Sequence, residues 1–280
     1  MVGEAFVANE RAALEQIGAN APGAAEGRNP EYLHQLRVGV RRLRSALRAF
    51  RQLLRRRRTT EIDRRLRRLL RALGAARDWD VCCVSLPGGE LLRRAQRERA
   101  KAQRIARAVV TSARFRDALG LARDWAHGAP WRSGADPAEP IRGFARRALR
   151  RLFGSLREDA EGIDWRATAR RHKVRIKVKR LRYGCEFLAS AFPHRSARAF
   201  LESLRTLQDI LGEMNDIEVQ RGLLRKLVPG GSPLKLVESE WAVREKLEPR
   251  ERALIAALGP AWTAFESRAP FWERAAAARV

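Results

Sequence analysis

The chain has 280 residues, of which 58 are Lys or Arg and 32 are Asp or Glu, so its formal net charge is +26. Because 45% of the residues are hydrophobic and many recur periodically, composition argues against disorder. Three cysteines, two of them adjacent, argue against a disulfide framework or a cysteine metal site. The charge predicts a polyanionic partner, which is nucleic acid, an anionic membrane surface or an inorganic phosphate polymer.

The N-terminal residues predict a soluble cytoplasmic protein. The segment MVGEAFVANERAALEQ has no basic region followed by a long apolar stretch, so no signal peptide is expected. No run approaches the roughly 18 apolar residues that a membrane span needs, and we expect no membrane contact. Apolar spacing predicts a helix over residues 4–18, and the Gly, Ala and Pro residues of 20–29 predict a loop.

A basic helix is predicted over residues 30–58, PEYLHQLRVGVRRLRSALRAFRQLLRRRR, which contain ten arginines and one acidic residue. Apolar residues recur at steps of three and four, and Pro30 suits the first turn. One flank, roughly 120° from the apolar face, gathers His34, Arg37, Arg41, Arg44 and Arg48. Because neighbouring cations repel one another, this flank predicts an anionic ligand. The string Arg55–Arg58 is interpreted as exposed charge at the end of this helix, where cations suit the helix dipole.

Helices are also predicted for most of the remaining chain. Their expected ranges are residues 60–86, 90–125, 141–158, 168–192, 197–227 and 234–258, followed by a break at Gly259-Pro260 and a closing helix over 262–277. The segment 127–137 contains two prolines and two glycines and is the expected boundary between halves. No segment alternates with period two, so the fold class is all-α.

An internal duplication is predicted from two matches at a single offset of 138 residues. The segment HQLRVGVRRLR from His34 matches HKVRIKVKRLR from His172, and LGAARDWD from Leu73 matches LGEMNDIE from Leu211. Pro87-Gly88-Gly89 is echoed by Pro229-Gly230-Gly231 at a slightly larger offset. We therefore expect two four-helix bundles related by an approximate two-fold, over residues 1–130 and 136–280, the second with a short additional C-terminal helix.

Motifs for catalysis are missing. No GxxxxGK[ST] loop, GxSxG or HExxH motif is present, so we expect a binding protein and not an enzyme, with no cofactor. The cations that follow His34 and His172 oppose a metal site, which leaves hydrogen bonds to an anion or a structural role for these histidines. Four acids also coincide between the repeats: Asp78, Asp80, Asp216 and Glu218. A metal or catalytic carboxylate pair is one interpretation, and ion pairs with arginine that position helices are favoured.

The paired basic motifs, each followed by a helix ending in LGAARDWD or LGEMND, resemble the conserved-histidine α-helical domain family, called CHAD. The resemblance covers nearly the whole chain and implies one CHAD domain made of two helical repeats with a basic groove or pore between them. It further implies binding of inorganic polyphosphate and localisation to polyphosphate granules. Its phosphate-contacting positions correspond to His34, Arg37, Arg41, Arg44, His172, Arg175, Lys179 and Arg182. Arg48 extends the first set by helix geometry alone, and Glu186 takes its place in the second.

Three functions follow from these observations. The leading hypothesis is a non-catalytic polyphosphate-binding protein, supported by the duplicated basic helices and the resemblance. The alternative is an RNA- or DNA-binding protein that uses the same basic surface, which charge alone supports. A hydrolase rests only on the histidines and carboxylates, and the ExExK motif of related triphosphate-tunnel domains is missing.

Overall fold

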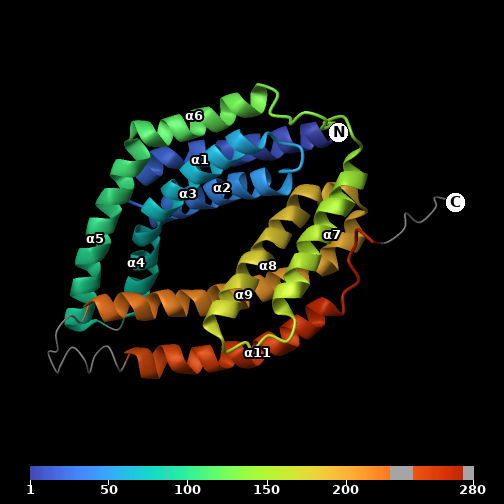
Figure 1. Cartoon of the computed structure of the whole chain (residues 1–280). Coiled ribbons are helices and arrows are strands. Elements are labelled where there is room, and N and C mark those ends of the chain that lie inside the picture. The colour runs from blue at the N-terminus through green and yellow to red at the C-terminus, as the bar shows by residue number, and fades with distance from the viewer. Residues whose placement is uncertain (87, 228–241, 274–280) are drawn as a thin grey trace. The chain divides into compact units, whose positions relative to one another are not determined.

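The protein is all-α. The computed structural model describes residues 1–86, 88–227 and 242–273, with only the backbone described for residues 194–196 and 242–244. Its α-helices are α1 (Val2–Glu26), α2 (Pro30–Ala49), α3 (Arg56–Ala72), α4 (Gly74–Ser85), α5 (Gly89–Thr111), α6 (Ala113–His127), α7 (Ile141–Ala160), α8 (Thr168–Leu188), α9 (His194–Leu227) and α11 (Glu248–Glu266). A 3₁₀ turn follows α8 at Ala189–Ala191, and a π-helical turn, Ala242–Leu247, precedes α11 (Figure 1). The described residues contain one isolated β-bridge, Leu54 with Trp131, and no strand.

The chain divides into two compact units. The α2 unit comprises Val7–Ala135 and Asp216–Glu251, and the α8 unit comprises Met1–Phe6, Asp136–Asn215 and Arg252–Val280. Each unit thus takes a segment from the other half of the sequence. The two predicted repeats, residues 1–130 and 136–280, and their descent from a duplication stay predictions.

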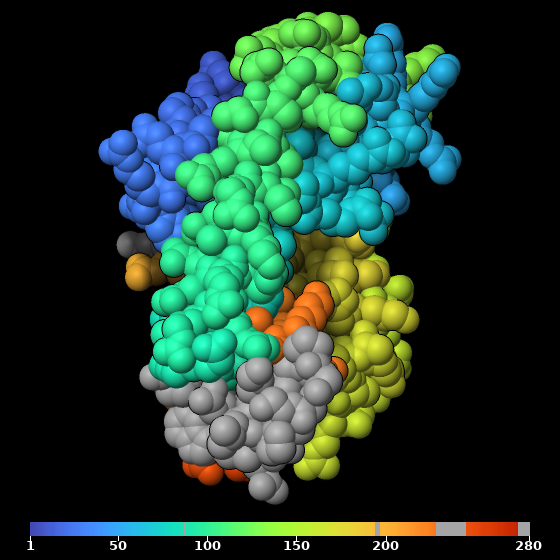
Figure 2. Space-filling model, turned by 90° about the vertical axis from the view of Figure 1, so that its left-hand side faces the viewer, coloured from blue at the N-terminus to red at the C-terminus, as the bar shows by residue number. Residues whose placement is uncertain are grey.

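The α2 unit packs around the apolar face of its basic helix. Leu36, Val40 and Leu43 of α2 are fully buried, and α2 contacts α3 and α4 while α3 also contacts α5 and α6. In Figure 2 the green atoms of α5 and α6 form the visible face of this unit, with the blue atoms of α1 on one side and the light-blue atoms of α3 on the other. Gly39 allows α1 to approach α2, since a Cβ there would lie 2.7 Å from Ile17 Cγ1.

The α8 unit has an aromatic core. Phe200 of α9 lies 5.0 Å from Trp272 and 5.2 Å from Phe265 between ring centroids, and Phe271 lies 4.9 Å from Trp272. Most of these pairs are edge-to-face, the arrangement that ring quadrupoles favour. Helices α7 and α8 pack along each other. The first residues of the chain join this unit, because the N–H of Gly3 donates to the carbonyl of Pro137 at 2.8 Å.

Two predicted helix ends near the basic helix are wrong. Helix α1 continues to Glu26 through the predicted loop 20–29, and Ala24 is buried while the ring of Tyr32 occupies the space beside Gly23. Helix α2 ends at Ala49 and not at residue 58, because the following segment turns away and the N–H of Arg55 donates to the carbonyl of Pro130 at 2.9 Å.

The interpretation of the Arg55–Arg58 string is also corrected in part. Arg56, Arg57 and Arg58 form the first turn of α3, where the helix dipole opposes cations, although all three are exposed as expected.

Longer predicted helices are interrupted, and one predicted break is bridged. The helix expected over 60–86 divides at Leu73 into α3 and α4, and that over 90–125 divides at Ser112, whose hydroxyl accepts from the N–H of Phe115 at 3.2 Å. The expected break at Gly259-Pro260 is wrong, since α11 runs through Pro260 and its burial of Leu258 and Phe265 offsets the lost backbone hydrogen bond. Predictions for Pro87, 229–231, 234–241 and 274–277 lie outside the described residues.

A buried carboxyl group in the α2 unit has a strongly raised pKa. Glu10 on α1 is 1% exposed, and neither Oε1 nor Oε2 has a hydrogen-bond partner in the described structure. Burial raises the pKa of Glu10 to about 7, against the opposing charge of Arg123 on α6. The unfolded chain has the ordinary value of 4.5, so the folded protein binds one more proton between these two pH values, and its stability falls as pH rises across them.

We expect Glu10→Gln to remove this pH dependence. At pH 8 the variant gains up to about 3 kcal/mol in the free energy of unfolding, whereas near pH 5 the gain is small. Urea unfolding of wild type and variant at pH 5 and pH 8 measures this gain in the free energy of unfolding. Glu15→Gln on the same helix, an exposed position, serves as the control and should change neither value. Equal stabilities of wild type and Glu10→Gln at both pH values would contradict the assignment.

Candidate anion-binding site

Helix α2 presents its predicted cationic flank in a fixed orientation. Asn29 caps the helix by accepting a hydrogen bond from the N–H of Glu31 at 2.9 Å, and Pro30 occupies the first turn. The buried apolar face then sets the rotation of the helix about its axis. As a result, all five predicted side chains of the flank, His34, Arg37, Arg41, Arg44 and Arg48, are partly buried beside that face.

Arg37 is the most constrained of these cations. One of its terminal nitrogens donates to the carbonyl of Leu70 at 3.2 Å, while its Nε is buried with no hydrogen-bond partner in the described structure. Burial lowers the pKa of Arg37 to about 10, and the charges of Arg41 and Arg77 add to this while Asp78 opposes it. The guanidinium therefore stays charged at neutral pH but incompletely compensated, which favours an anionic ligand.

His34 lies in the same cationic surroundings. Burial lowers the pKa of His34, the charge of Arg77 lowers it further, and Glu31 opposes these effects, while Arg41 and Arg37 also lower it. The imidazole is therefore neutral at neutral pH, with one N–H donor and one acceptor nitrogen. An anion bound here would accept a hydrogen bond from it and favour its protonated form.

Arg77 of α4 is a site residue that the sequence analysis missed. Its charge acts on both His34 and Arg37, and α4 contacts α2. The break at Leu73 and the missing side chain of Gly74, whose Cβ would lie 3.4 Å from Arg37, let α4 start beside the guanidinium. The sequence feature that could have identified Arg77 as a site residue was its position within the repeated LGAARDWD motif. We call His34, Arg37, Arg41 and Arg77 the α2 cluster.

The C-terminal part of the flank is already compensated by a carboxylate. Arg44 donates to both oxygens of Asp63 at 2.9 and 3.2 Å, and Arg48 donates to the same oxygens at 3.2 and 3.3 Å. Burial alone would raise the pKa of Asp63, but the hydrogen bond from Arg44 and the charges of Arg48 and Arg44 lower it overall. An anionic ligand must therefore compete with Asp63 for these two arginines. In the described structure, Arg41 and Arg77 form no ion pair.

Helix α8 carries the second predicted set. His172 is exposed, while Arg175, Lys179 and Arg182 are partly buried. Arg182 donates to Glu186 Oε1 and to Gln208 Oε1, both at 2.5 Å, and its guanidinium lies 4.8 Å from the centre of the Tyr183 ring. Arg182 and Arg44, which occupy matching positions in the two motifs, are thus both held by carboxylates.

Two of the four repeated acids take part in ion pairs, which fits a structural role. Asp80 is 5% exposed and accepts hydrogen bonds from Arg99 at 2.5 Å and Gln103 at 3.0 Å. Glu218 lies 3.4 Å from Arg221, which also pairs with Glu251 at 2.6 Å.

The other two acids repel each other within the α2 unit. Burial raises the pKa of Asp78, and its repulsion by Asp216 adds to this while the charges of Arg37, Arg77 and Lys226 oppose it. Asp78 therefore compensates part of the charge of Arg37 and Arg77 in the α2 cluster.

Comparisons with known proteins identify the class of this chain. The family model described as CHAD domain matches residues 10–225, so the chain belongs to the CHAD domain family. The crystal structure of the CHAD domain from the plant Ricinus communis is similar, with a TM-score of 0.72 and 28% identity, over 95% of this chain and 92% of that one. The structure of PptA from Streptomyces chartreusis shares the fold, with a TM-score of 0.75 and 16% identity, over 94% and 99% of the two chains. No curated protein sequence matches.

Two further findings concern metal binding and membrane insertion. In the described part of the chain, no three His, Cys, Asp or Glu side chains are grouped so that they could hold a metal ion. None of the helices in that same part is both long and apolar enough to pass through a bilayer.

Asp63 predicts a pH-dependent contribution to stability. Its pKa is lowered on folding, so its ion pairs stabilise the protein above the ordinary carboxyl pKa and this stabilisation is lost as pH falls through the lowered value. We expect Asp63→Asn to reduce the free energy of unfolding at pH 7 by about 1–3 kcal/mol, because two partly buried arginines lose their partner. Below the lowered pKa the difference should vanish. Chemical unfolding from pH 2 to 7 tests this, with exposed Asp117→Asn as the control.

Proposed function

We propose that the protein binds inorganic polyphosphate without catalysis, and that the α2 cluster is a principal contact for the polymer. The observation that carries the proposal is the concentration of three partly buried arginines and a histidine, with the carboxylates of Asp78 and Glu31 acting on only part of this positive charge. Membership of the CHAD family supports it, since the resemblance of the basic motifs to that family implies this ligand.

A phosphate polymer suits this chemistry for three reasons. Guanidinium groups donate two parallel hydrogen bonds to phosphate oxygens, and such charge-assisted bonds are stronger than neutral ones. Partial burial lowers the local dielectric constant, which strengthens attraction to an anion that replaces water. A linear polyanion also releases counterions when it binds, which adds a favourable entropy term. Arg37, whose positive charge is deeply buried, strengthens this attraction through its charge.

The other predicted positions are expected to contribute unequally to polyphosphate binding. Arg44 and Arg48 contribute to polyphosphate binding only if phosphate displaces Asp63 from them. Arg182 contributes only if phosphate displaces Glu186 from it. His172, Arg175 and Lys179 on α8 remain proposed contacts. The groove or pore between two bundles that the resemblance implies stays a prediction, as do cytoplasmic location and association with polyphosphate granules.

The decisive experiment compares two double variants of equal charge. Arg41→Gln with Arg77→Gln should weaken polyphosphate binding at least about tenfold, because each charge-assisted hydrogen bond contributes on the order of 1.5–3 kcal/mol. Arg57→Gln with Arg68→Gln removes the same charge from the exposed face of α3 and should cost less than about threefold. Isothermal titration calorimetry measures both, with circular dichroism as the folding check.

Asp63→Asn should give the opposite result and bind more tightly than wild type, since it releases Arg44 and Arg48. Equal losses in the two arginine double variants would mean that affinity follows net charge alone, and the proposed site would then be wrong.

The nucleic-acid alternative is separated by ligand competition. We expect polyphosphate to bind more tightly than single-stranded RNA of equal phosphate number at the same salt concentration. The reason is that RNA binding relies on aromatic side chains that stack on bases, whereas the α2 cluster consists of cationic and imidazole groups. Fluorescence anisotropy with labelled RNA and unlabelled polyphosphate provides the measurement, and both affinities should fall steeply with salt. RNA that binds as tightly as polyphosphate would favour the alternative.

A further inference from the structure

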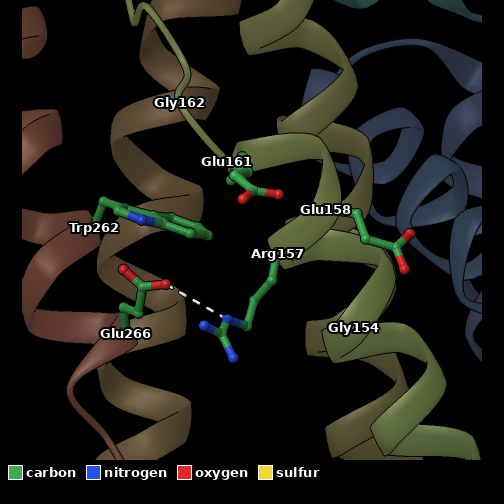
Figure 3. A pocket seen from close by; sticks show the side chains of 8 residues that line it. Gly154, Arg157, Glu158, Glu161, Gly162, Trp262 and Glu266 are labelled. Atoms are coloured by element: carbon green, nitrogen blue, oxygen red, sulfur yellow. Dashed lines mark ion pairs between the residues drawn. The ribbon is translucent and has the colours of Figure 1, made fainter.

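A pocket of about 520 Å³ lies within the α8 unit, and its lining contains no residue of the two basic motifs. It is formed by the C-terminal end of α7, the residues that follow it and the last turns of α11. Figure 3 shows Trp262 and Glu266 of α11 on one wall, with Arg157 and Glu161 facing them and Glu158 directed away from the indole. Gly154, Ala160 and Gly162 complete the lining.

The charge of this pocket is opposite to that of the chain. Its lining contains three glutamates and one arginine, in a protein whose net charge is +26. Arg157 lies 3.5 Å from Glu266 and so neutralises part of that negative charge. Glu161 forms no ion pair in the described structure, and it stands at the end of α7, where the helix dipole is negative. The pocket therefore favours a cation.

The indole wall of the pocket is held in place before any ligand binds. Trp262 packs against Trp165 with 5.8 Å between ring centroids and against Phe265 with 5.6 Å. Opposite it, Arg170 donates to the carbonyls of Glu161 at 3.0 Å and of Gly162 at 3.4 Å, which fixes the segment after α7. Because both walls are ordered before a ligand binds, ordering them on binding costs little free energy.

The composition of the lining selects an organic cation over a metal ion. In the described residues, no three acidic, histidine or cysteine side chains are close enough to hold a metal, and the pocket's glutamates are included in that finding. An ammonium group, by contrast, is attracted to the face of an indole and needs only one carboxylate beside it. We propose that this pocket binds a linear alkyl polyamine, with one ammonium group at Trp262 and Glu161 and another at Glu266. This site is independent of polyphosphate binding.

Gly154 provides a way to block the pocket without unfolding the protein. It lies inside α7, and a Cβ at this position would meet no atom within 4 Å. Leucine favours helix by about 1 kcal/mol over glycine, so Gly154→Leu should place a bulky side chain in the pocket while keeping or raising stability. Gly120→Leu on α6 is the matched control, because a Cβ there also meets nothing within 4 Å.

The experiment is calorimetric titration of the full chain with spermidine at low salt, in the absence of polyphosphate. We expect saturable binding at one site, weakened at least about fivefold by Glu161→Gln through the lost ammonium contact and abolished by Gly154→Leu. Glu202→Gln, an exposed glutamate in the same unit, and Gly120→Leu should bind within about twofold of wild type. Magnesium at the same charge concentration should not displace spermidine.

Three results would overturn the proposal. They are binding that does not saturate, a Gly154→Leu variant that binds as wild type does, and equal weakening by Glu161→Gln and Glu202→Gln.

Discussion

The structure of the α2 unit depends on how partly buried arginines are compensated. Helix α2 must bury its apolar face, and the cationic flank beside that face is drawn partly out of water. Removing a charge from water costs free energy unless a partner of opposite sign replaces the lost hydration. Asp63 provides that partner for Arg44 and Arg48, whereas Asp78 acts on Arg37 and Arg77, and in the described structure Arg41 forms no ion pair. This unequal compensation divides the flank into a structural part and a part suited to an anion.

Helix α8 meets the same constraint with a different carboxylate. At the offset of 138 residues, Leu201 stands where Asp63 would be expected and Glu186 stands where Arg48 would be. The carboxylate that pairs with Arg182 thus lies on the basic helix itself, one turn beyond Arg182, at 2.5 Å, and not on a neighbouring helix as Asp63 does. Asn215 likewise stands at the position of Arg77, so the second set lacks that additional cation. The two basic helices are similar in pattern but differ in the placement of their carboxylates and in the cation at the position of Arg77, and we expect the α2 cluster to contribute more to anion binding.

The sequence was sufficient to predict the fold class, the basic helix and its family. These features depend on helical periodicity and on spacing within one helix, both of which are local. The breaks at Leu73 and Ser112 were missed, although Ser112 caps α6 locally. The continuation through Pro260 was also missed, because it is decided by packing between distant segments. The burial of Phe265, for example, outweighs the local tendency of Gly259-Pro260 to end a helix. Asp63 and Arg77 were missed as parts of the site for the same reason, since each reaches α2 from another helix.

The C-terminal segment has a role that the family match does not cover. That match ends at residue 225, yet Phe265, Phe271 and Trp272 are at most 1% exposed and complete the aromatic core of the α8 unit. The residues that form the α11 wall of the acidic pocket, Trp262 and Glu266, lie in the same segment. Substitutions on the exposed side of α11 can therefore alter this pocket while its buried side maintains the core. The cation chemistry of the pocket and the anion chemistry of α2 rest on different residues of different units, so each can change in evolution without the other.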